Sequence, residues 1–556
     1  MILRGLRPFD IEPSASIFSA LSPGHARPEA ARTGRDRRAR RSLSFEANPS
    51  MPIESAVVGT YFACLCVLSI YGAHRYHIIR LYRRHRKDVP VPKARFESPP
   101  AVTVQLPIFN ELYVVERLVR SVCAIRWPKD RLEIQILDDS TDETSEVAAR
   151  LCDEYRARGF DIHHLRRTHR DGFKAGALRE GFARSKGDLI AIFDADFMPE
   201  PDLLEKTVDH FTDDDVGMVQ TRWGHVNRSY SLLTHLEAMY LDGHFVLEHT
   251  ARQRSGRFFN FNGTAGIWRR ACITDAGGWQ HDTLTEDLDL SYRAQLRGWK
   301  FVFLKDVVSP GEVPVEMTAF KSQQHRWAKG SIQTGRKILP AIWRSRVPLA
   351  VKVEATFHLT ANFAYLLVVL MSLLMLPTVA FRARIESGLW GFLFDASLMM
   401  AATVSVGWFY AFAQREIDSR WRERLWQLPF ALSLGIGLSL NNARAVIEAL
   451  AGHGSTFRRT PKYAVTEPSD TSWARKKYAS GRSLLPVLEL AFAAYFAVIV
   501  GYALGQRLWF TAAFLLIFLF GFLYVGLLSV IQRNFVGRAL GGEPVPKRTA
   551  SHAIAP

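Results

Sequence analysis

Five apolar stretches constrain the fold of this chain more than any other feature. They cover residues 56–71, 357–381, 389–413, 484–504 and 508–531. A helix needs roughly 20 apolar residues to cross about 30 Å of hydrocarbon, and these stretches are of that order. A long polar segment separates the first stretch from the other four. We therefore expect a multi-pass membrane protein in which one sizeable polar domain is inserted between helical spans.

Basic residues indicate the side of the membrane on which the polar domain lies. The chain has 71 Lys and Arg against 54 Asp and Glu, a formal net charge of +17. Residues 74–87, directly after the first apolar stretch, are dense in Arg, His and Lys. Because Lys and Arg accumulate in cytosolic loops, the domain that follows should lie in the cytosol. A nucleic-acid partner has no support beyond the basic N-terminal tail, so we expect none.

The N-terminal tail, residues 1–50, is rich in Arg, Ala, Ser and Pro and has no hydrophobic period. This composition predicts disorder. With an odd number of spans and a cytosolic C-terminus, the tail would lie outside, against its positive charge. A chain that begins at Met51 avoids this conflict, so we expect Met51 to be the true start. Peptides from before Met51 in the native protein would contradict this expectation.

The polar domain has the pattern of a layered α/β fold. From residue 101 to about residue 309, short β-rich runs alternate with amphipathic helical stretches. Residues 102–106, 134–137 and 189–193 are predicted strands. Ligands bind beyond the carboxyl ends of strands in open α/β sheets. We therefore expect the polar residues after these strands to converge on one edge: Asn110, Glu111, Asp138, Asp139, Asp194 and Asp196.

One C-terminal segment is ambiguous. Residues 428–450 are apolar but include Asn441, Asn442, Arg444 and Glu448. Such a segment fits either a membrane span or a helix in the membrane interface. We favour the interface, because that choice returns the basic loop at residues 456–482 to the cytosol.

The triplet Asp194-Ala195-Asp196 directly follows an apolar strand. Two carboxylates one residue apart suit Mg²⁺ or Mn²⁺ bound to a diphosphate, because these ions prefer oxygen ligands. A solvated turn is the better explanation of the triplet taken alone.

Two further motifs also have a structural and a functional interpretation. Ser140 or Thr141 could cap a helix that starts near Glu143, which explains the acidic run at residues 138–142. Lys174 precedes small residues at a helix start, where a phosphate could approach closely. A capped helix explains each motif alone.

Thr285-Glu286-Asp287 precedes a periodic helical pattern. Thr285 could cap this helix, with both acids favourably placed at its N-terminus. The same carboxylates could act as a general base, separate from a metal-binding pair.

The run from Gln323 to Trp327, Gln-Gln-His-Arg-Trp, combines a permanent cation with an indole. Arg326 suits a diphosphate and Trp327 suits stacking on a sugar. The same two residues could instead anchor a helix at the membrane interface.

Taken in order, these motifs resemble those of processive family 2 glycosyltransferases, such as bacterial cellulose synthases and hyaluronan and chitin synthases. The resemblance covers residues 101–337. Residues 107–111, 138–139, 174–176, 194–196, 261–266, 285–287 and 323–327 carry it. The sequence is more similar to cellulose-synthase-like proteins that make glucomannan or the xyloglucan backbone, through residues 220–227, 261–266 and 323–327. That similarity implies a β-1,4 linkage.

The resemblance implies a fold and a role for each motif. The fold is an α/β GT-A-type nucleotide-sugar-binding domain inserted between α-helical transmembrane segments. Asp139 and Glu111 would contact the nucleoside, and Lys174, Asp194 and Arg326 would contact the rest of the nucleotide sugar. Asp196, with Asp194, would bind the metal, Mg²⁺ or Mn²⁺. The acceptor would be bound by Gln323, Trp327 and Glu286, and Asp287 would be the catalytic base.

A basic loop is similar to the cellulose synthase gating loop, Phe-x-Val-Thr-x-Lys, which closes over the nucleotide. Phe457, Thr460 and Lys462 match this pattern, but Arg459 replaces the valine. The match is therefore partial.

We expect an inverting, processive transferase that polymerises a β-1,4-linked glucan, mannan or glucomannan and translocates it across a membrane. Its partners would be a nucleotide sugar, the growing polysaccharide, membrane lipid and export proteins. UDP-glucose and GDP-mannose both remain open as donors. The alternative is transfer of one sugar to a membrane lipid, since Gln-x-x-Arg-Trp also occurs in ceramide glucosyltransferases. The expected location is a bacterial inner membrane, with the catalytic domain in the cytosol.

The expected organisation has seven parts. They are a disordered basic tail (1–50), a transmembrane anchor (51–80), the cytosolic transferase domain (95–340), interfacial helices with a transmembrane hairpin (341–450), a cytosolic gating-type loop (451–482), a second transmembrane hairpin (483–533) and a C-terminal tail (534–556).

Overall fold

The computed structural model describes residues 51–382, 397–398, 400–453, 459–466, 470, 472–476, 478 and 483–539. The expected N-terminal tail, residue Phe457 of the basic loop and residues 540–556 lie outside this description.

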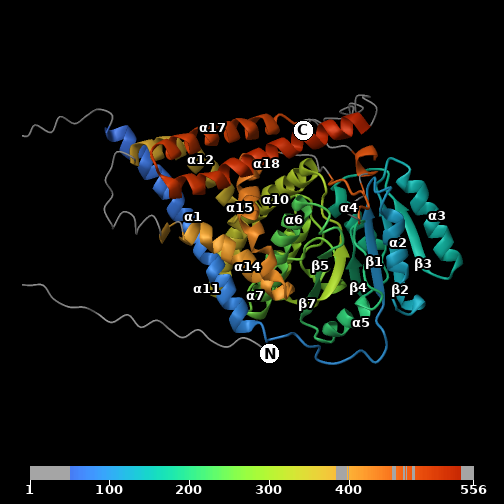
Figure 1. Cartoon of the computed structure of the whole chain (residues 1–556). Coiled ribbons are helices and arrows are strands. Elements are labelled where there is room, and N and C mark those ends of the chain that lie inside the picture. The colour runs from blue at the N-terminus through green and yellow to red at the C-terminus, as the bar shows by residue number, and fades with distance from the viewer. Residues whose placement is uncertain are drawn as a thin grey trace, which may run out of the picture. The chain divides into compact units, whose positions relative to one another are not determined.

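A seven-stranded mixed sheet forms the centre of the polar domain (Figure 1). Its strands are β1 (Val102–Ile108), β2 (Leu132–Asp138), β3 (Asp161–Arg166), β4 (Leu189–Ile192), β5 (Val216–His225), β6 (Gly266–Arg269) and β7 (Lys300–Gly311). The strand order is β3-β2-β1-β4-β6-β5-β7. Strands β1 to β4 are parallel, β6 is antiparallel to both β4 and β5, and β5 is parallel to β7. The three strands predicted from the sequence are confirmed as β1, β2 and β4.

Helices cover both faces of this sheet, which is why β1, β2 and β4 are almost continuously buried. The helical segments of the domain are α2 (Val115–Cys123), η1 (Lys129–Arg131), α3 (Thr144–Ala157), α4 (Phe173–Arg184), α5 (Leu203–Thr207), η2 (Val208–Thr212), α6 (Leu232–Asp242), η3 (Gly243–His249), α7 (Thr250–Arg254), α8 (Arg270–Asp275) and α9 (Glu286–Leu296). One apolar core packs α2 and α3 against the sheet, and a second packs α4, α8 and α9 against it. This is the expected GT-A-like arrangement of a mixed sheet between helices.

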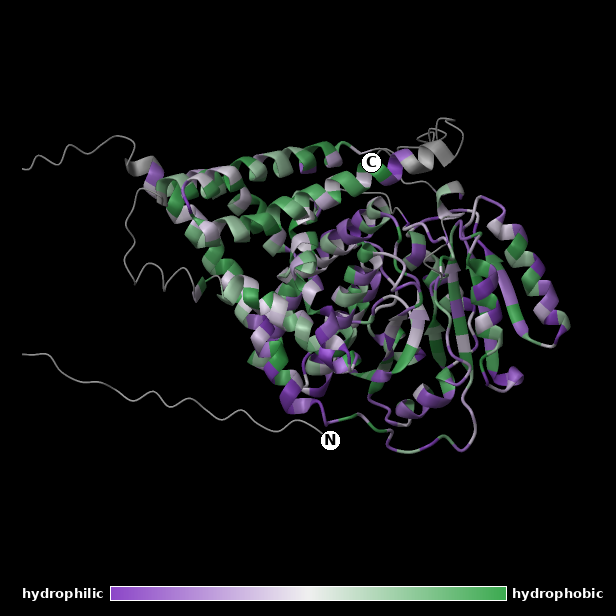
Figure 2. Ribbon diagram, viewed as in Figure 1, coloured by the Kyte–Doolittle hydropathy of each residue, from purple (hydrophilic) through white to green (hydrophobic). Residues whose placement is uncertain are grey.

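Helical segments, several of them apolar, precede and follow the domain. They are α1 (Met51–His85), α10 (Met317–Arg344), α11 (Leu349–Thr360), α12 (Phe363–Arg382), η4 (Met400–Val404), α14 (Ser405–Ile417), η5 (Trp421–Gln427), α15 (Leu428–Gly437), α16 (Ser439–Leu450), η6 (Ser472–Arg475), α17 (Leu485–Gly505) and α18 (Trp509–Ala539). Within the described residues, four helical segments are long and apolar enough to span a membrane: Glu54–His85, Phe363–Phe381, Leu485–Gly505 and Trp509–Asn534. Their hydrophobic residues colour these helices largely green in Figure 2. The chain is thus a multi-pass membrane protein.

The ambiguous segment 428–450 forms two helices. The segments Trp421–Gly437 and Ser439–Leu450 meet at an angle of 40°, so together they could form a broken span or a re-entrant loop. Helix α15 packs closely on α18. The two backbones are so near at Gly437 that a Cβ there would lie only 2.3 Å from the carbonyl oxygen of Gly521, so only glycine fits. The remaining expected span, residues 389–413, lies partly outside the described residues.

Membrane helices hold α10 at its N-terminal end. Gln532 of α18 accepts a hydrogen bond from the Met317 amide (2.8 Å) and donates one to the Val315 carbonyl (3.1 Å). One turn later, Lys321 forms a buried ion pair with Glu489 of α17, at 2.5 Å. The helix that carries Gln323, Arg326 and Trp327 is thus fixed to the C-terminal hairpin.

Candidate active site

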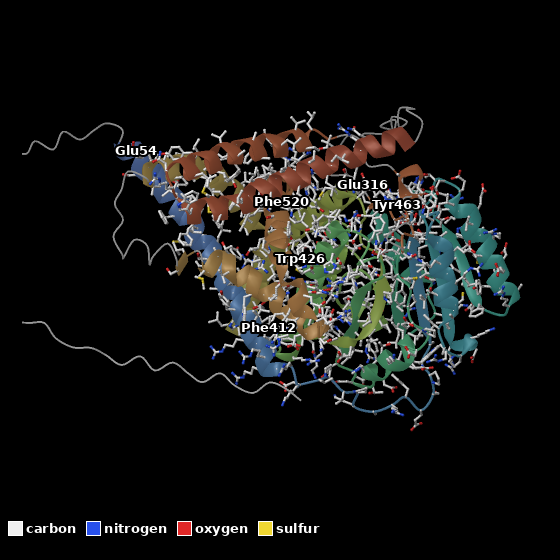
Figure 3. All side chains as sticks on the ribbon, viewed as in Figure 1. Glu54, Glu316, Phe412, Trp426, Tyr463 and Phe520 are labelled. Carbon is white, nitrogen blue, oxygen red and sulfur yellow. The ribbon has the colours of Figure 1, made fainter. Side chains whose placement is uncertain are left out.

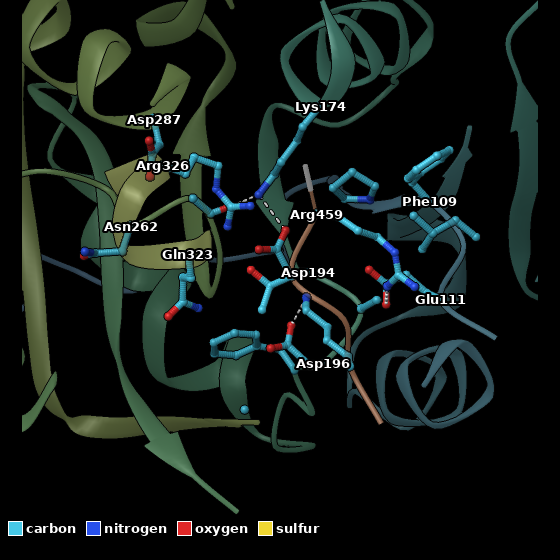
Figure 4. Close-up of a pocket in the computed structure, with 18 of the residues that line it drawn as sticks. Phe109, Glu111, Lys174, Asp194, Asp196, Asn262, Asp287, Gln323, Arg326 and Arg459 are labelled. Carbon is cyan, nitrogen blue, oxygen red and sulfur yellow. Dashed lines mark hydrogen bonds and ion pairs between the residues drawn. The ribbon is translucent and has the colours of Figure 1, made fainter. Parts of the chain in front are cut away.

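A single pocket brings the sequence motifs together (Figure 4). It lies beyond the carboxyl ends of β1, β2 and β4, where a ligand site is expected in an α/β sheet. Its lining includes every candidate residue except Phe457: Glu111, Asp139, Lys174, Asp194, Asp196, Glu286, Asp287, Gln323, Arg326, Trp327, Thr460 and Lys462.

Two of the polar residues expected at the strand ends do not line the pocket. Asp138 is buried beneath it and accepts hydrogen bonds from the Ser140 amide and from His164. Asn110 has a positive φ of 55°, and its side-chain oxygen accepts a hydrogen bond from the Thr141 amide at 2.8 Å. Both residues therefore shape the loops that carry Glu111 and Asp139.

Asp194 and Lys174 form the centre of the pocket. Lys174 Nζ lies 2.5 Å from Asp194 Oδ1 and donates a second hydrogen bond to the Gly263 carbonyl, at 2.8 Å. Burial opposes the charge on Asp194, but the ammonium groups of Lys174 and Lys462 outweigh it and lower its pKa. Asp194 is thus held as a carboxylate at the end of β4.

Asp196 also faces an ammonium group. Lys462, from the basic loop, donates a hydrogen bond to Asp196. Both carboxylates of the triplet are therefore paired with lysine ammonium groups of the chain itself. Carboxylate oxygens are also the ligands that a divalent ion such as Mg²⁺ requires. Ala195 and Asp196 do form a turn, but Asp196 is buried and both acids are paired with lysines, so the turn is not simply a solvated one.

Asp287 lies at the N-terminus of α9, beside Gly263. A Cβ at Gly263, whose φ is +80°, would lie 3.1 Å from Asp287 Oδ2. Burial and the neighbouring Glu286 carboxylate raise the pKa of Asp287 to about 7. Such a carboxyl can both accept and release a proton near neutral pH.

The proposed helix caps are not formed. The Thr285 side chain makes no capping hydrogen bond to α9, and its Oγ1 lies 3.3 Å from Thr334 Oγ1 on α10 instead. Helix α3 begins at Thr144, and Ser140 accepts a hydrogen bond from the Asn110 amide rather than from α3. Thr285 and Ser140 therefore do not cap their helices, and Asp142 caps α3 instead, because its Oδ1 accepts a hydrogen bond from the Thr144 amide at 3.0 Å.

The Gln-Gln-His-Arg-Trp run lies in the middle of α10. Gln323, Arg326 and Trp327 are spaced by three and four residues, so they share the helix face that lines the pocket. On another face, Lys329 donates a hydrogen bond to Glu448 of α16 at 3.1 Å. Helix α10 therefore connects the pocket to the membrane helices.

Acidic and basic side chains pair at the opposite end of the pocket. Figure 4 shows Asp287 and Arg326 on one side, Asp194 in the middle, and Glu111 with Arg459 on the other side. Arg459 Nη1 lies 2.7 Å from Glu111 Oε2. The other predicted nucleoside contact, Asp139, accepts hydrogen bonds from Arg167 at 2.8 and 2.5 Å.

Two acidic residues that the sequence motifs did not indicate, Glu312 and Glu316, hold the basic loop against the domain. Glu312, directly after β7, accepts hydrogen bonds from the amides of Tyr463 and Val465 at 3.2 and 3.3 Å. The Tyr463 hydroxyl donates a hydrogen bond to the Tyr478 carbonyl (2.7 Å) and lies 3.4 Å from Glu316 Oε2; Figure 3 labels Tyr463 and Glu316. The only sequence signal for Glu312 is that it follows a strand.

Known proteins are similar to this chain in sequence. Residues 99–330 match the family model described as "Glycosyltransferase like family 2". Glucomannan 4-beta-mannosyltransferase 1 of Oryza sativa subsp. japonica is 38% identical over 325 residues, which are 56% of this chain and 62% of that protein. Glucomannan 4-beta-mannosyltransferase 2 of Arabidopsis thaliana is 44% identical over 252 residues, 44% of this chain and 47% of that protein. The chain thus spans less than two thirds of the length of these relatives.

A solved structure also shows a distant likeness. The mannosyltransferase PcManGT from Pyrobaculum calidifontis, in complex with GDP-Man and Mn²⁺, is 19% identical with a TM-score of 0.45. The match covers 72% of this chain and 100% of that chain. The matched range, residues 99–330, includes every residue that lines the pocket except those of the basic loop. Residues 99–330 therefore form a family 2 glycosyltransferase domain, as the sequence motifs predicted.

Proposed function

We propose that this protein is an inverting, processive mannosyltransferase that extends a β-1,4-linked mannan or glucomannan from GDP-mannose. The observation that carries the proposal is the pocket, which separates the Asp287 carboxyl from the carboxylates of Asp194 and Asp196. The names of the curated relatives favour mannose as the transferred sugar.

The proposed reaction is one in-line displacement. Asp287 removes the proton from a hydroxyl of the acceptor's terminal sugar. The hydroxyl oxygen forms a bond to the anomeric carbon as the bond from that carbon to the diphosphate breaks. The configuration of the donor sugar is therefore inverted.

Cationic side chains stabilise the leaving group in this mechanism. The pocket places Lys174 and Arg326 near the Asp194 carboxylate. Their charges would offset the negative charge that develops on the leaving diphosphate. Gln323 and Trp327, on the same face of α10, would bind the acceptor, with Glu286 beside the base.

The pocket also fits Mg²⁺ or Mn²⁺. Among the described residues, no group of three His, Cys, Asp or Glu could hold a metal ion. Asp196 and Asp194 supply two carboxylates, and ions of this kind commonly bind one or two carboxylates together with substrate phosphates. When bound, the ion would neutralise charge on the diphosphate.

The relatives named above come from plants, so they give no support to a bacterial inner membrane. Our proposal is limited to a membrane that has the catalytic domain on its cytosolic face. The spans that adjoin the pocket would line the exit path of the polymer.

Purified protein in lipid, supplied with Mn²⁺ or Mg²⁺ and each radiolabelled donor, tests this proposal. We expect a polymer from GDP-mannose that a β-1,4-mannanase degrades. A lipid-soluble product with one sugar would support the alternative function instead. Asp287→Asn should abolish transfer and retain nucleotide binding, so turnover by this variant would exclude Asp287 as the base.

A further inference from the structure

The strongest unexplained feature lies at the nucleoside end of the pocket. The side chains of Arg459 and Glu111 are only 11% and 8% exposed. Burial raises the pKa of Glu111, and the positive charge of Arg459 opposes this effect. The two groups form a buried ion pair at the end of the pocket farthest from Asp287 (Figure 4).

This ion pair leaves hydrogen-bonding capacity unused. Arg459 Nη1 and Nη2 and Glu111 Oε2 have no hydrogen-bond partner within the described part of the chain, although Nη1 lies close to Oε2. Thr460 Oγ1, the next side chain along the pocket, also lacks a partner there. Buried polar atoms are normally hydrogen-bonded, so such a cluster in a pocket points to a ligand.

Aromatic side chains fix the position of the guanidinium group. Arg459 Cζ lies 4.1 Å from the ring centroid of Tyr478, and this ring contacts Tyr113 edge to face at 5.5 Å. The pocket lining nearby includes Phe109, with Arg170 Cζ 3.3 Å from its ring centroid. Of these planar groups, Phe109 and the guanidinium groups of Arg170 and Arg459 line the pocket, where a nucleobase could stack.

We propose that Arg459, paired with Glu111, makes the donor site selective for guanine nucleotides. The Hoogsteen edge of guanine has two adjacent acceptors, O6 and N7, which match the two donors of an arginine fork. Its N1–H and 2-amino groups are donors that a carboxylate accepts. Uracil has a C5–H beside its O4, and adenine has an amino group beside its N7, so neither matches the fork.

This inference rests on the proposed function, because it assigns the nucleotide of the same donor site. It also gives a physical meaning to the position at which the loop departs from the cellulose synthase pattern. The side chain of a valine there would have no hydrogen-bond donor, whereas the Arg459 side chain has a planar, permanently charged guanidinium group with its donors in a fork.

Equilibrium binding of GDP, UDP and ADP to the full chain in lipid nanodiscs with Mn²⁺ tests the proposal. We expect the wild type to bind GDP at least about tenfold more tightly than UDP or ADP, since a bidentate arginine contact discriminates bases by about that factor or more. Arg459→Val should weaken GDP binding by a similar factor and change UDP binding by less than about twofold.

Arg459→Lys separates charge from geometry, because lysine keeps the charge and loses the fork. We expect it to lose most of the preference for GDP. Arg131→Val, which removes an exposed arginine outside the pocket, should leave all three affinities unchanged. Equal weakening of GDP and UDP in both Arg459 variants would overturn the proposal, as would a wild type without preference for GDP.

Failure of the proposed function is distinguishable, because binding is measured without turnover. A protein that prefers GDP through Arg459 but makes no mannan would contradict only the proposed function. A mannan synthase whose Arg459 variants keep the preference for GDP would contradict only the assignment of Arg459.

Discussion

At the scale of single residues, the environment of Asp287 determines its protonation. Burial disfavours its charged form, and the adjacent Glu286 carboxylate disfavours it further, so its pKa rises to about 7. A base must be deprotonated to accept a proton. Only about a tenth of the molecules would have an ionised Asp287 at pH 6, whereas most would have one at pH 8.

We therefore expect kcat/KM for the donor to rise with pH through about 7. Glu286→Gln removes the neighbouring negative charge, so it should lower the pKa of Asp287 and move this rise to a lower pH. Rates measured from pH 5 to 9 in both proteins check the prediction. An unchanged midpoint in Glu286→Gln would show that another group controls the profile.

Gly263 allows the backbone to pass close to the Asp287 carboxyl. Alanine there would adopt a positive φ of +80°, at a cost of about 1 kcal/mol or more, and its Cβ would press against Asp287. Gly159 has a similar φ of +82°, and a Cβ at this position would meet nothing within 4 Å, so Gly159→Ala is a matched control for backbone strain. We expect similar losses of thermal stability in the two variants, but at least about tenfold lower kcat only in Gly263→Ala. Equal kcat values would show that the contact is unimportant.

The sequence predicted some pocket residues better than others, for a physical reason. Asp139, Asp194 and Asp196 follow predicted strands, and parallel strands bring their carboxyl ends to one edge. Arg459 lies in an irregular loop far along the chain, where no periodicity indicates its contact with Glu111. The resemblance identified the loop, but only the structure identified the contact.

At the scale of elements, a buried ion pair fixes α10 to the membrane hairpin. The side chains of Lys321 and Glu489 are 6% and 0% exposed. Removal of one partner leaves an uncompensated charge in an apolar environment, which typically costs about 3–5 kcal/mol. Because α10 carries Gln323, Arg326 and Trp327, its displacement should also impair catalysis.

We expect Lys321→Met to lower the thermal unfolding midpoint strongly, and the double variant Lys321→Met, Glu489→Leu to recover most of this loss. Lys300→Met, which removes a lysine from an exposed ion pair, is the matched control and should have no measurable effect. Unfolding in lipid nanodiscs followed by tryptophan fluorescence checks both variants. A double variant as unstable as the single one would exclude the ion pair as the cause.

The apolar pattern located the helices but not their breaks. It predicted the hairpin of α17 and α18 closely, because both helices are continuous apolar runs. It favoured an interfacial path for residues 428–450 but did not indicate the break between α15 and α16, beside which Gly437 closely approaches Gly521. Packing between distant elements has no local signal in the sequence.

At the scale of the whole chain, the hairpin contacts imply a topology. Glu489, near the start of α17, and Gln532, near the end of α18, both contact the N-terminal part of α10. At 1.5 Å per residue, the turn between the two helices, around Gln506, is about 35 Å from Gln532 along α18 and about 26 Å from Glu489 along α17. These lengths are close to the hydrocarbon thickness of a membrane, about 30 Å, so the turn should lie on the face opposite the catalytic domain.

Labelling of single cysteines in a chain without its five native cysteines checks this topology. In sealed vesicles with the catalytic domain inside, we expect a membrane-impermeant maleimide to label a cysteine at Gln506 but not one at Arg131 on the domain surface. Inverted vesicles should show the opposite pattern. Labelling of both positions from one side would place the turn and the domain on the same face, and α17 and α18 could then not form a spanning hairpin beside a polymer exit path.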